Sequence, residues 1–327
     1  MRDREDRPWI HDITRPAALL TALFLDLTLG DPPNRFHPVA WMGSLIAGAQ
    51  RRAPRHGHLA QLAYGALVAI GGTLGALSAG RLAKRVIERL PAPLNGLTEG
   101  AVLKMTFSVG RLTAVARQIE TTLSAPEQDL AEARRLASWH LVSRDTSQLD
   151  SSQVAAAAIE SVAESASDGI MAPLLAYAAF GLPGALAYRF VNTADSMLGY
   201  RDAAREWLGK IPARMDDALN VIPARMTAFL LTLGAGLVGE SARNAWRTWR
   251  RDSGKTASPN AGHPMSAMAG ALEIELEKVD HYTLGQGHRP PRTEDIGRAV
   301  RVMQAAVGLG IPLLTGLILI ARRLSEK

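Results

Sequence analysis

The sequence predicts an all-α, multi-pass integral membrane protein with polar helical loops. Apolar residues make up 47% of the 327 residues, and they are gathered into blocks that basic residues flank. Two blocks, residues 59–80 and 302–321, contain no charged residue, and a run of about 18 such residues is long enough to cross a bilayer as a helix. The alternative, a buried core helix for each block, stays open. We expect a single membrane-embedded domain over residues 1–327, with four to five apolar segments near residues 16–29, 59–80, 169–188, 222–239 and 302–321.

The composition excludes several classes of site and partner. The absence of cysteine excludes disulfides and thiolate metal or redox sites, and the eight histidines show no metal-ligand spacing. Basic residues beside apolar segments explain the net charge of +6, and no base-stacking motif accompanies them. We therefore expect contact with the lipid of the cell (inner) membrane and none with nucleic acid. The polar N-terminus has no small-residue cleavage site, so we expect no removable secretory signal.

The first apolar segment, residues 16–29, is short and contains Asp26. Because an aspartate is costly against lipid, we expect Asp26 to face protein. The sequence that follows, GDPPNRFHPVAWMG over residues 30–43, predicts an ordered turn. Two interpretations stay open: an interfacial loop with an aromatic anchor at Trp41, or a polar site to which Asp26, Asp31 and His37 contribute.

Residues 59–80 are the first strong spanning segment, and basic residues at both ends leave its orientation open. Pro91 and Pro93 end the helical pattern. From residue 97 to residue 141, apolar residues return at helical spacing among polar ones, which indicates a polar helical hairpin. We expect this hairpin to be scaffold.

An acidic helix is expected after Asp150, which is a good N-cap residue. Glu160, Glu164 and Asp168 follow at i, i+4 and i+8, so they share one face of a regular helix. Carboxylates at this spacing repel one another, and no Lys or Arg lies between Gln153 and Asp168. A Mg²⁺ ion or a substrate cation would relieve the repulsion. The alternative, a solvated acidic face, stays open.

The charge-free residues 169–188 are interrupted by Pro173 and by Gly-Leu-Pro-Gly at 181–184, so we expect two short helices around a bend. If 59–80 and 169–188 each crossed once, the polar stretches around them would fall on opposite sides of the bilayer. We therefore expect 169–188 to be re-entrant. The alternative is a 59–80 segment that doubles back at Gly71-Gly72.

The chain downstream of this bend carries further polar turns. Arg225 begins an apolar segment, where it could reach the interface or clamp an anion. Residues 241–255 are basic and contain Trp246 and Trp249, which is typical of the cytoplasmic membrane surface. Residues 258–272 open a helix, and Ser258 and Asn260 could cap it or bind an anion there; capping is the simpler interpretation.

Six stretches, in this order, carry a family resemblance: GDPPNRFHPVAWMG, SRDTSQLD, AAIESVAESASDGIMAPLL, YRFVNTADSMLGYRD, RMDDALNVIPAR and SPNAGHPMSAMAGAL. The chain closely resembles the adenosylcobinamide-phosphate synthase family of cobalamin biosynthesis (CobD/CbiB) from about Asp26 to about Leu284. Ser143 and Ser165 depart from the family pattern, where Gly and Asn are usual. Both are small polar changes that affect local ligand geometry.

The resemblance implies an ATP-dependent C–N ligase that joins adenosylcobyric acid to aminopropanol or its O-phosphate. It implies Mg²⁺ and ATP, a corrinoid substrate, and association with other corrinoid-pathway enzymes. No Walker loop is present, so the ATP contacts are not readable. Alternatives are a membrane transporter with intramembrane charges and a metal-dependent membrane phosphotransferase.

The expected site residues fall into three groups. The catalytic candidates are Glu160, Glu164, Asp168, Asp195 and His37. The candidates for binding substrate or phosphate are Arg144, Asp145, Arg189, Asn192, Asn220, Arg225, Ser258 and Asn260. The candidates for binding metal are Asp31, Glu164, Asp168, Asp216 and Asp217.

Overall fold

The computed structural model describes residues 14–125, 129–140, 146–200, 202, 205–278 and 281–325, and within these ranges it confirms the all-α class. A two-stranded antiparallel hairpin accompanies the helices. The helices are α2 (Thr14–Thr28), α3 (Pro38–Arg51), α4 (His58–Ile87), α5 (Leu94–Lys104), α6 (Val109–Ser124), α7 (Leu130–His140), α8 (Ser151–Ser165), α9 (Ala172–Leu198), α10 (Lys210–Leu219), α11 (Val221–Leu237), α12 (Ala242–Asp252), α13 (Gly262–Leu272) and α14 (Thr293–Ser325). A 3-10 turn, η1 (Asn34–Phe36), a π-helix, η2 (Ala166–Met171), and the strands β1 (Leu276–Lys278) and β2 (Tyr282–Leu284) complete the elements.

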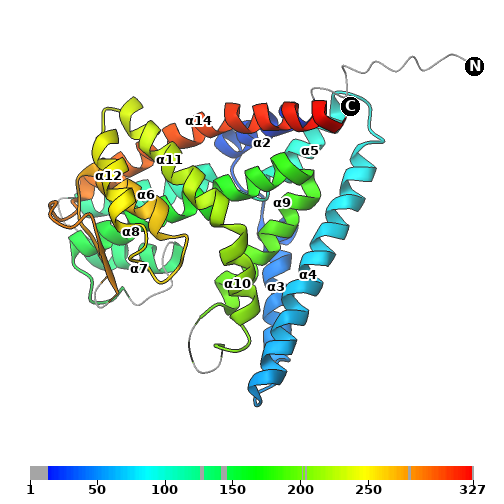
Figure 1. The fold of residues 1–327 in the computed structure, drawn as a ribbon, viewed down its shortest axis with the longest axis horizontal. Coiled ribbons are helices and arrows are strands. Elements are labelled where there is room, and N and C mark those ends of the chain that lie inside the picture. Colours follow the sequence, from blue (N-terminus) through cyan, green and yellow to red (C-terminus); the bar gives the residue numbers. More distant parts are fainter. Residues whose placement is uncertain are drawn as a thin grey trace, which may run out of the picture. The chain divides into compact units, whose positions relative to one another are not determined.

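The chain forms two compact units that interleave along the sequence (Figure 1). The first unit comprises residues 1–108, 173–216 and 311–327, and the second comprises residues 109–172 and 217–310. The expectation of a single membrane-embedded domain stays a prediction.

The first unit contains α4, a helix of 30 residues. It runs without a break through Gly71 and Gly72, so the alternative in which residues 59–80 double back is wrong. Antiparallel α3 and α4 form a hairpin (Figure 1), and Tyr64 Oη donates a hydrogen bond to the Ala49 carbonyl at 3.1 Å. Gly72 allows α9 to approach, because a Cβ there would lie 1.9 Å from the Phe190 ring.

The bend expected within residues 169–188 is present in α9. Gly181 has φ 69° and ψ −162°, a conformation that favours glycine, and Pro183 follows it. Four residues before the kink, the Tyr177 carbonyl accepts a hydrogen bond from Arg15 Nη2 at 2.6 Å. The Tyr177 hydroxyl donates to Glu99 Oε1 at 2.8 Å. Residues from α2 and α5 therefore brace the kink with polar contacts.

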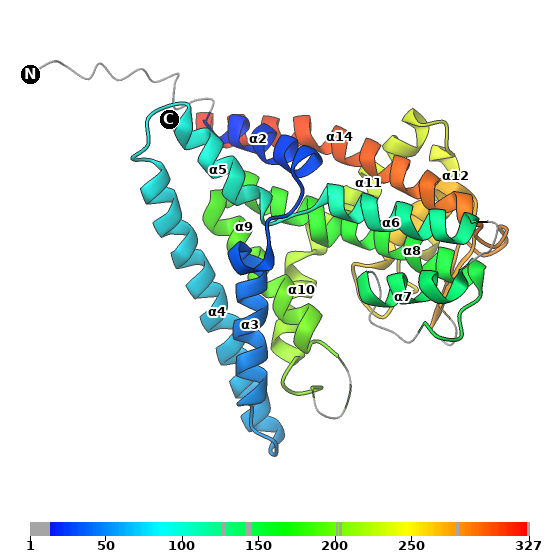
Figure 2. The same ribbon diagram turned by 180° about the vertical axis from the view of Figure 1, so that it is seen from behind.

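The second unit packs α6, α7 and α8 together (Figure 2) and packs α13 against α11 and α12. The helical spacing predicted in α6 is confirmed, since Val115, Ile119 and Leu123 are buried. Asp150 caps α8 as expected: its Oδ1 accepts from the Gln153 amide at 2.8 Å, and Gln153 Oε1 accepts from the Asp150 amide at 3.0 Å. This reciprocal pair is a capping box, which fixes where the acidic helix begins.

Membrane-spanning character is supported by helix length and composition. Among the described residues, His58–Ile87, Ser151–Leu198 and Thr293–Ile320 are long and apolar enough to cross a membrane, and α10 with α11 makes a fourth if counted as one bent span. All five expected apolar segments form helices, although α2, with 15 residues, is short for a crossing. The run Ser151–Leu198, at 48 residues, is far longer than the ~20 residues that a single crossing needs.

The re-entrance of residues 169–188 stays a prediction, and single-cysteine labelling tests it in this naturally cysteine-free chain. Ser151 and Ser196 are exposed and flank the segment, so a cysteine at either position is open to a membrane-impermeant maleimide. We expect both to react from the same side of sealed vesicles. Ala218→Cys, also exposed, extends the map to the start of α11. Reaction of positions 151 and 196 from opposite sides would show a full crossing instead.

The buried carboxylate of Asp252 links the end of α12 to Gly285, which follows the β-hairpin of the second unit. Asp252, at the end of α12, is fully buried, and Arg251 Nη2, Lys255 Nζ and the Gly285 amide each lie 2.8 Å from its oxygens. Burial alone would raise the pKa of Asp252, but these hydrogen bonds outweigh it and hold the pKa at about 2.

Acid should therefore destabilise this link. Because the folded pKa of Asp252 lies below its ordinary value, the ion contributes about 2 kcal/mol above pH 4, and this contribution disappears as the pH falls towards 2. Urea unfolding of the detergent-solubilised protein between pH 2 and 5 measures the loss. Asp252→Asn is expected to remove that part of the pH dependence; an unchanged slope in the variant would contradict the assignment.

Candidate active site

Four polar residues meet in the first unit. Lys104, at the end of α5, is only 3% exposed, and its Nζ lies 3.5 Å from Asp26 Oδ1 and forms a closer ion pair with Asp31. The expectation that Asp26 faces protein is confirmed, because it is 2% exposed and paired with Lys104. His37 Nε2 lies 4.0 Å from Asp31. The turn over residues 30–43 therefore contributes to a polar cluster, as one of its two interpretations proposed.

His37 has a local structural role within this cluster. Its Nδ1 accepts a hydrogen bond from the Val39 amide at 3.2 Å, so it caps α3. Burial is the main cause that lowers the pKa of His37; Asp31 opposes the shift, while Lys104 and Arg189 add to it. The neutral imidazole that results keeps its proton on Nε2, because Nδ1 is the acceptor.

A second polar group in the first unit lies along α9 and α10. Arg189 Nη1 donates to Asn192 Oδ1 at 2.9 Å, and Asn192 Nδ2 donates to Asp216 Oδ1 at 3.3 Å. Asn192 is 6% exposed, so this arrangement is held in place by protein on most sides. Asp195 lies one turn further along α9 and is half-buried. A guanidinium, an amide and a carboxylate are thus linked in sequence, a set that suits phosphate or carboxylate recognition.

The acidic helix of the second unit differs from the regular helix that we expected. Glu160 is 5% exposed, whereas Glu164 is exposed and Asp168 is half-buried. The regular helix α8 ends at Ser165, and the π-helix η2, which begins at Ala166, contains Asp168. A π-turn takes more residues than an α-turn, so the spacing from Glu164 to Asp168 is not that of a regular α-helix. Helical segments of this kind are frequent at functional sites.

The carboxylates of the described residues limit how Mg²⁺ could be held. In the described part of the chain, no group of three or more His, Cys, Asp or Glu side chains is arranged to hold a metal ion. Mg²⁺ commonly uses one or two carboxylates and takes its other ligands from phosphate and water. Within the second unit, Glu164 and Asp168 fit that mode as carboxylate donors that are not fully buried. The residues therefore suit an ion that arrives with a nucleotide.

Asn260 connects three segments of the second unit. Its Nδ2 donates to the Asp217 carbonyl at 2.7 Å, and its Oδ1 accepts from Arg225 Nη1 at 3.4 Å. Ser258 Oγ accepts from the amides of Asn260 and Ala261 at 3.3 Å, so it stabilises the turn that precedes α13. The capping interpretation is refined: these two residues organise the turn, and the N-cap position itself is Ala261.

Further polar residues border this turn. Trp249 Nε1 donates to His263 Nδ1 at 2.8 Å, and burial, followed by the charge of Arg225, lowers the pKa of His263. Asn220, 3% exposed, immediately precedes α11. Arg225 is exposed, so its guanidinium faces an accessible surface lined by amide and imidazole groups.

The structure thus gathers the sequence candidates into clusters within each unit. The first unit holds Asp31, His37, Arg189, Asn192, Asp195 and Asp216, and the second holds Glu160, Glu164, Asp168, Asp217, Asn220, Arg225, Ser258 and Asn260. Arg144 and Asp145 lie outside the described residues. Sequence reasoning missed Lys104 and His263. Lys104 could have been found as the single charge in the apolar run AVLKMTF, whereas the partner of His263 is not readable from the chain.

Comparison with known proteins identifies relatives of this chain. A family model described as CobD/Cbib protein matches residues 19–304. The chain is 41% identical to cobalamin biosynthesis protein CobD of Dehalococcoides mccartyi over 304 residues, which is 93% of this chain and 97% of the relative. It is 39% identical over 314 residues to CobD of Klebsiella pneumoniae (91% and 96% covered) and 38% identical over 308 residues to CbiB of Salmonella typhimurium (90% and 94% covered). No solved structure matches the chain.

Proposed function

The chain belongs to the CobD/CbiB family of cobalamin biosynthesis proteins, and from this premise we propose that it is an adenosylcobinamide-phosphate synthase. The reaction joins the free propionate of adenosylcobyric acid to aminopropanol or its O-phosphate through an amide bond, with ATP consumed. One observation carries the proposal: the family match over residues 19–304 contains every candidate site residue of both units.

The chemistry requires activation of a carboxylate. A propionate oxygen attacks the γ-phosphorus of ATP, giving an acyl phosphate and ADP. The neutral amine then attacks the acyl carbon, the C–O bond to phosphate breaks, and inorganic phosphate leaves. The nitrogen releases one proton, which needs an acceptor within hydrogen-bond reach. Mg²⁺ supplies charge neutralisation for the phosphate oxygens when bound.

The geometry supports a division of roles. Arg189, Asn192 and Asp216 form a linked recognition set in the first unit, and Arg225 with Asn260 forms one in the second. Arginine is the preferred partner for phosphate or carboxylate because its planar fork matches their oxygens. Glu164 and Asp168 are the carboxylates assigned to Mg²⁺ and to the amine proton. His37 is less suited to accept that proton, because its Nδ1 already accepts from the Val39 amide.

The cellular setting follows from the same premise. We place the protein in the cell (inner) membrane as a multi-pass protein, in contact with lipid and with the enzymes that act on corrinoids before and after it. The support for membrane insertion is the set of three to four long apolar helices found among the described residues.

The test is a reconstituted assay. The full-length protein in liposomes is incubated with adenosylcobyric acid, aminopropanol O-phosphate and Mg-ATP, and the amide product is followed by mass spectrometry. We expect a product that depends on both ATP and Mg²⁺, with aminopropanol compared as the second amine. Folded protein that gives no amide with either amine would remove the proposal, and ATP consumption with phosphate transfer to the amino alcohol would favour a phosphotransferase.

A further inference from the structure

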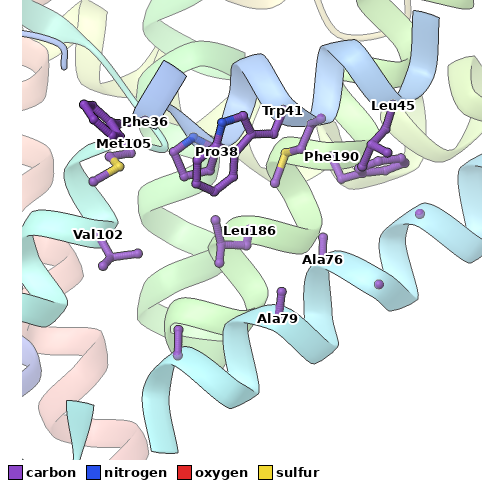
Figure 3. A pocket seen from close by; sticks show the side chains of 14 residues that line it. Phe36, Pro38, Trp41, Leu45, Ala76, Ala79, Val102, Met105, Leu186 and Phe190 are labelled. Atoms are coloured by element: carbon purple, nitrogen blue, oxygen red, sulfur yellow. The ribbon is translucent and has the colours of Figure 1, made fainter. Parts of the chain in front are cut away.

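An apolar cavity of about 500 Å³ lies within the first unit (Figure 3), between α3, α4, α5 and α9. The side chains of Trp41, Met105, Leu186 and Phe190 form its walls, and small residues of α4, among them Gly75 and Ala79, form its floor. The volume lies within the range of about 300–1,000 Å³ typical of ligand pockets. The lining is almost wholly carbon, so a polar ligand would find few partners inside.

Small residues of α4 keep this space open. A Cβ at Gly75 would meet nothing within 4 Å, although Gly75 lines the cavity. In Figure 3, Ala76 and Ala79 of α4 point towards Leu186 of α9 across the space. A larger residue could therefore be placed at position 75 of α4 without touching backbone.

The helix α4, which lines the cavity, also carries an exposed apolar surface and is long and apolar enough to cross a membrane. Only 11% of the spanning window of α4 is buried within the protein, and Leu67, Ile70 and Leu74 of the same helix are exposed. At the other wall, Trp41 is 53% exposed. Water inside an apolar cavity lacks hydrogen-bond partners, and an empty cavity loses dispersion contacts along its whole lining. An apolar chain that enters from the bilayer meets neither cost.

The positively charged side chain of Arg35 lies beside the cavity. The guanidinium of Arg35 lies over the Phe36 ring, 4.7 Å from its centre, and Phe36 lines the cavity. The Arg35 carbonyl accepts a hydrogen bond from Trp41 Nε1 at 2.9 Å, so the loop is tied to a second lining residue. Arg35 is exposed, and its charge complements a phosphate group at the edge of an apolar site.

We propose that this groove binds one acyl chain of a membrane phospholipid, and that Arg35 holds the phosphate of the same molecule. The groove shares no lining residue with the polar clusters assigned to the amide-forming reaction, although Phe36 and Phe190 adjoin His37 and Arg189 in the chain. It makes a lipid a fixed part of the first unit. Because the chain fills the space between α4 and the helices α3, α5 and α9, it also supports their packing.

Photo-crosslinking tests the proposal. The full-length protein is reconstituted in vesicles of phosphatidylethanolamine and phosphatidylglycerol that contain a phosphatidylglycerol with a diazirine on one acyl chain. After irradiation, peptide mass spectrometry is expected to find the label on Trp41, Met105 and Leu186, and on the outward-facing Leu67 and Leu74. Labelling of the outer positions only would mean that the groove is closed to lipid or filled by another occupant, such as a second copy of the chain.

A matched pair of variants sharpens the result. Gly75→Leu fills the groove and is expected to lower labelling of Trp41, Met105 and Leu186 about tenfold. Gly71→Leu also adds a side chain into open space on α4, but Gly71 does not line the cavity, so labelling should stay at the wild-type level. Equal labelling of Leu67 and Leu74 in all three proteins reports correct insertion. Unchanged groove labelling in Gly75→Leu would overturn the acyl-chain assignment.

The role of Arg35 has its own measurement. Arg35→Gln removes the charge, so unlabelled phosphatidylglycerol should compete with the probe less well than it does in the wild-type protein, while a neutral diacylglycerol should compete equally in both. Identical competition by the two lipids in both proteins would show that no phosphate is held there. Displacement of the label by adenosylcobyric acid would assign the groove to substrate and overturn the proposal without touching the amide-forming function.

Discussion

Glu164→Gln is expected to lower the rate of amide formation by about 10²- to 10⁴-fold while expression and folding stay normal. The substitution keeps the shape of the side chain and removes its charge, and Glu164 is exposed beside the π-helix, so little packing is at risk. Its carboxylate is assigned to Mg²⁺ or to the amine proton, and glutamine can serve neither role at neutral pH. The measurement is the initial rate of amide production in the reconstituted assay.

The control for this prediction is Glu277→Gln in the same unit. Glu277 is exposed on β1 and lies outside both polar clusters, so turnover should stay close to that of the wild-type protein. A Mg²⁺ titration separates the two roles, since a loss that high Mg²⁺ restores points to metal binding. Near-normal turnover of Glu164→Gln would mean that Glu164 is only a solvated surface carboxylate.

Lys104→Met is expected to destabilise the first unit by about 3–5 kcal/mol. The variant removes the ammonium that pairs with Asp26 and Asp31 while keeping much of the side-chain volume, so a 2% exposed carboxylate at Asp26 loses its cation. Thermal unfolding in detergent measures the change. The double variant Asp26→Asn with Lys104→Met is expected to recover a large part of it, because the buried charge is then removed on both sides.

Lys84→Met is the matched control for Lys104. Lys84 is partly exposed on α4 and its partner Glu88 lies 3.7 Å away with most of its side chain in solvent, so the expected change is about 0–1 kcal/mol. Equal unfolding temperatures for the two lysine variants would show that the buried pair does not stabilise the fold.

Local patterns predicted much of the fold. The charge-free run of 59–80 predicted α4, the oxygen of Asp150 predicted the start of α8, and the Gly-Pro sequence at 181–184 predicted the kink in α9. Each depends on residues close together in the sequence. The cost of charge in an apolar segment similarly predicted that Asp26 faces protein, although not that its partner is Lys104.

The contacts within the candidate site were harder to predict from the sequence than the helices were. Helical spacing alone did not predict that a π-helix over Ala166–Met171 follows α8 and contains Asp168. Contacts such as Trp249 with His263 and Asn260 with the Asp217 carbonyl join segments that the sequence separates. Asn260 was expected to cap a helix, and only the structure reveals that it ties three segments together. The sequence identified the residue types of the candidate site, whereas it did not identify the hydrogen-bond and ion-pair partners of these residues.

The buried pair of Asp26 and Lys104 also constrains how the nascent chain enters the membrane. A charge opposes insertion by about 2.5–3.5 kcal/mol at the centre of a spanning helix and by less near its end, and α2 carries Asp26 within a helix of only 15 residues. The helix α4 has no such charge in its centre and can be inserted as soon as it leaves the ribosome. Stable placement of α2 has to wait until α5 is synthesised and Lys104 neutralises Asp26. Insertion of the N-terminal region is therefore expected to be completed out of sequence order, with α4 ahead of α2.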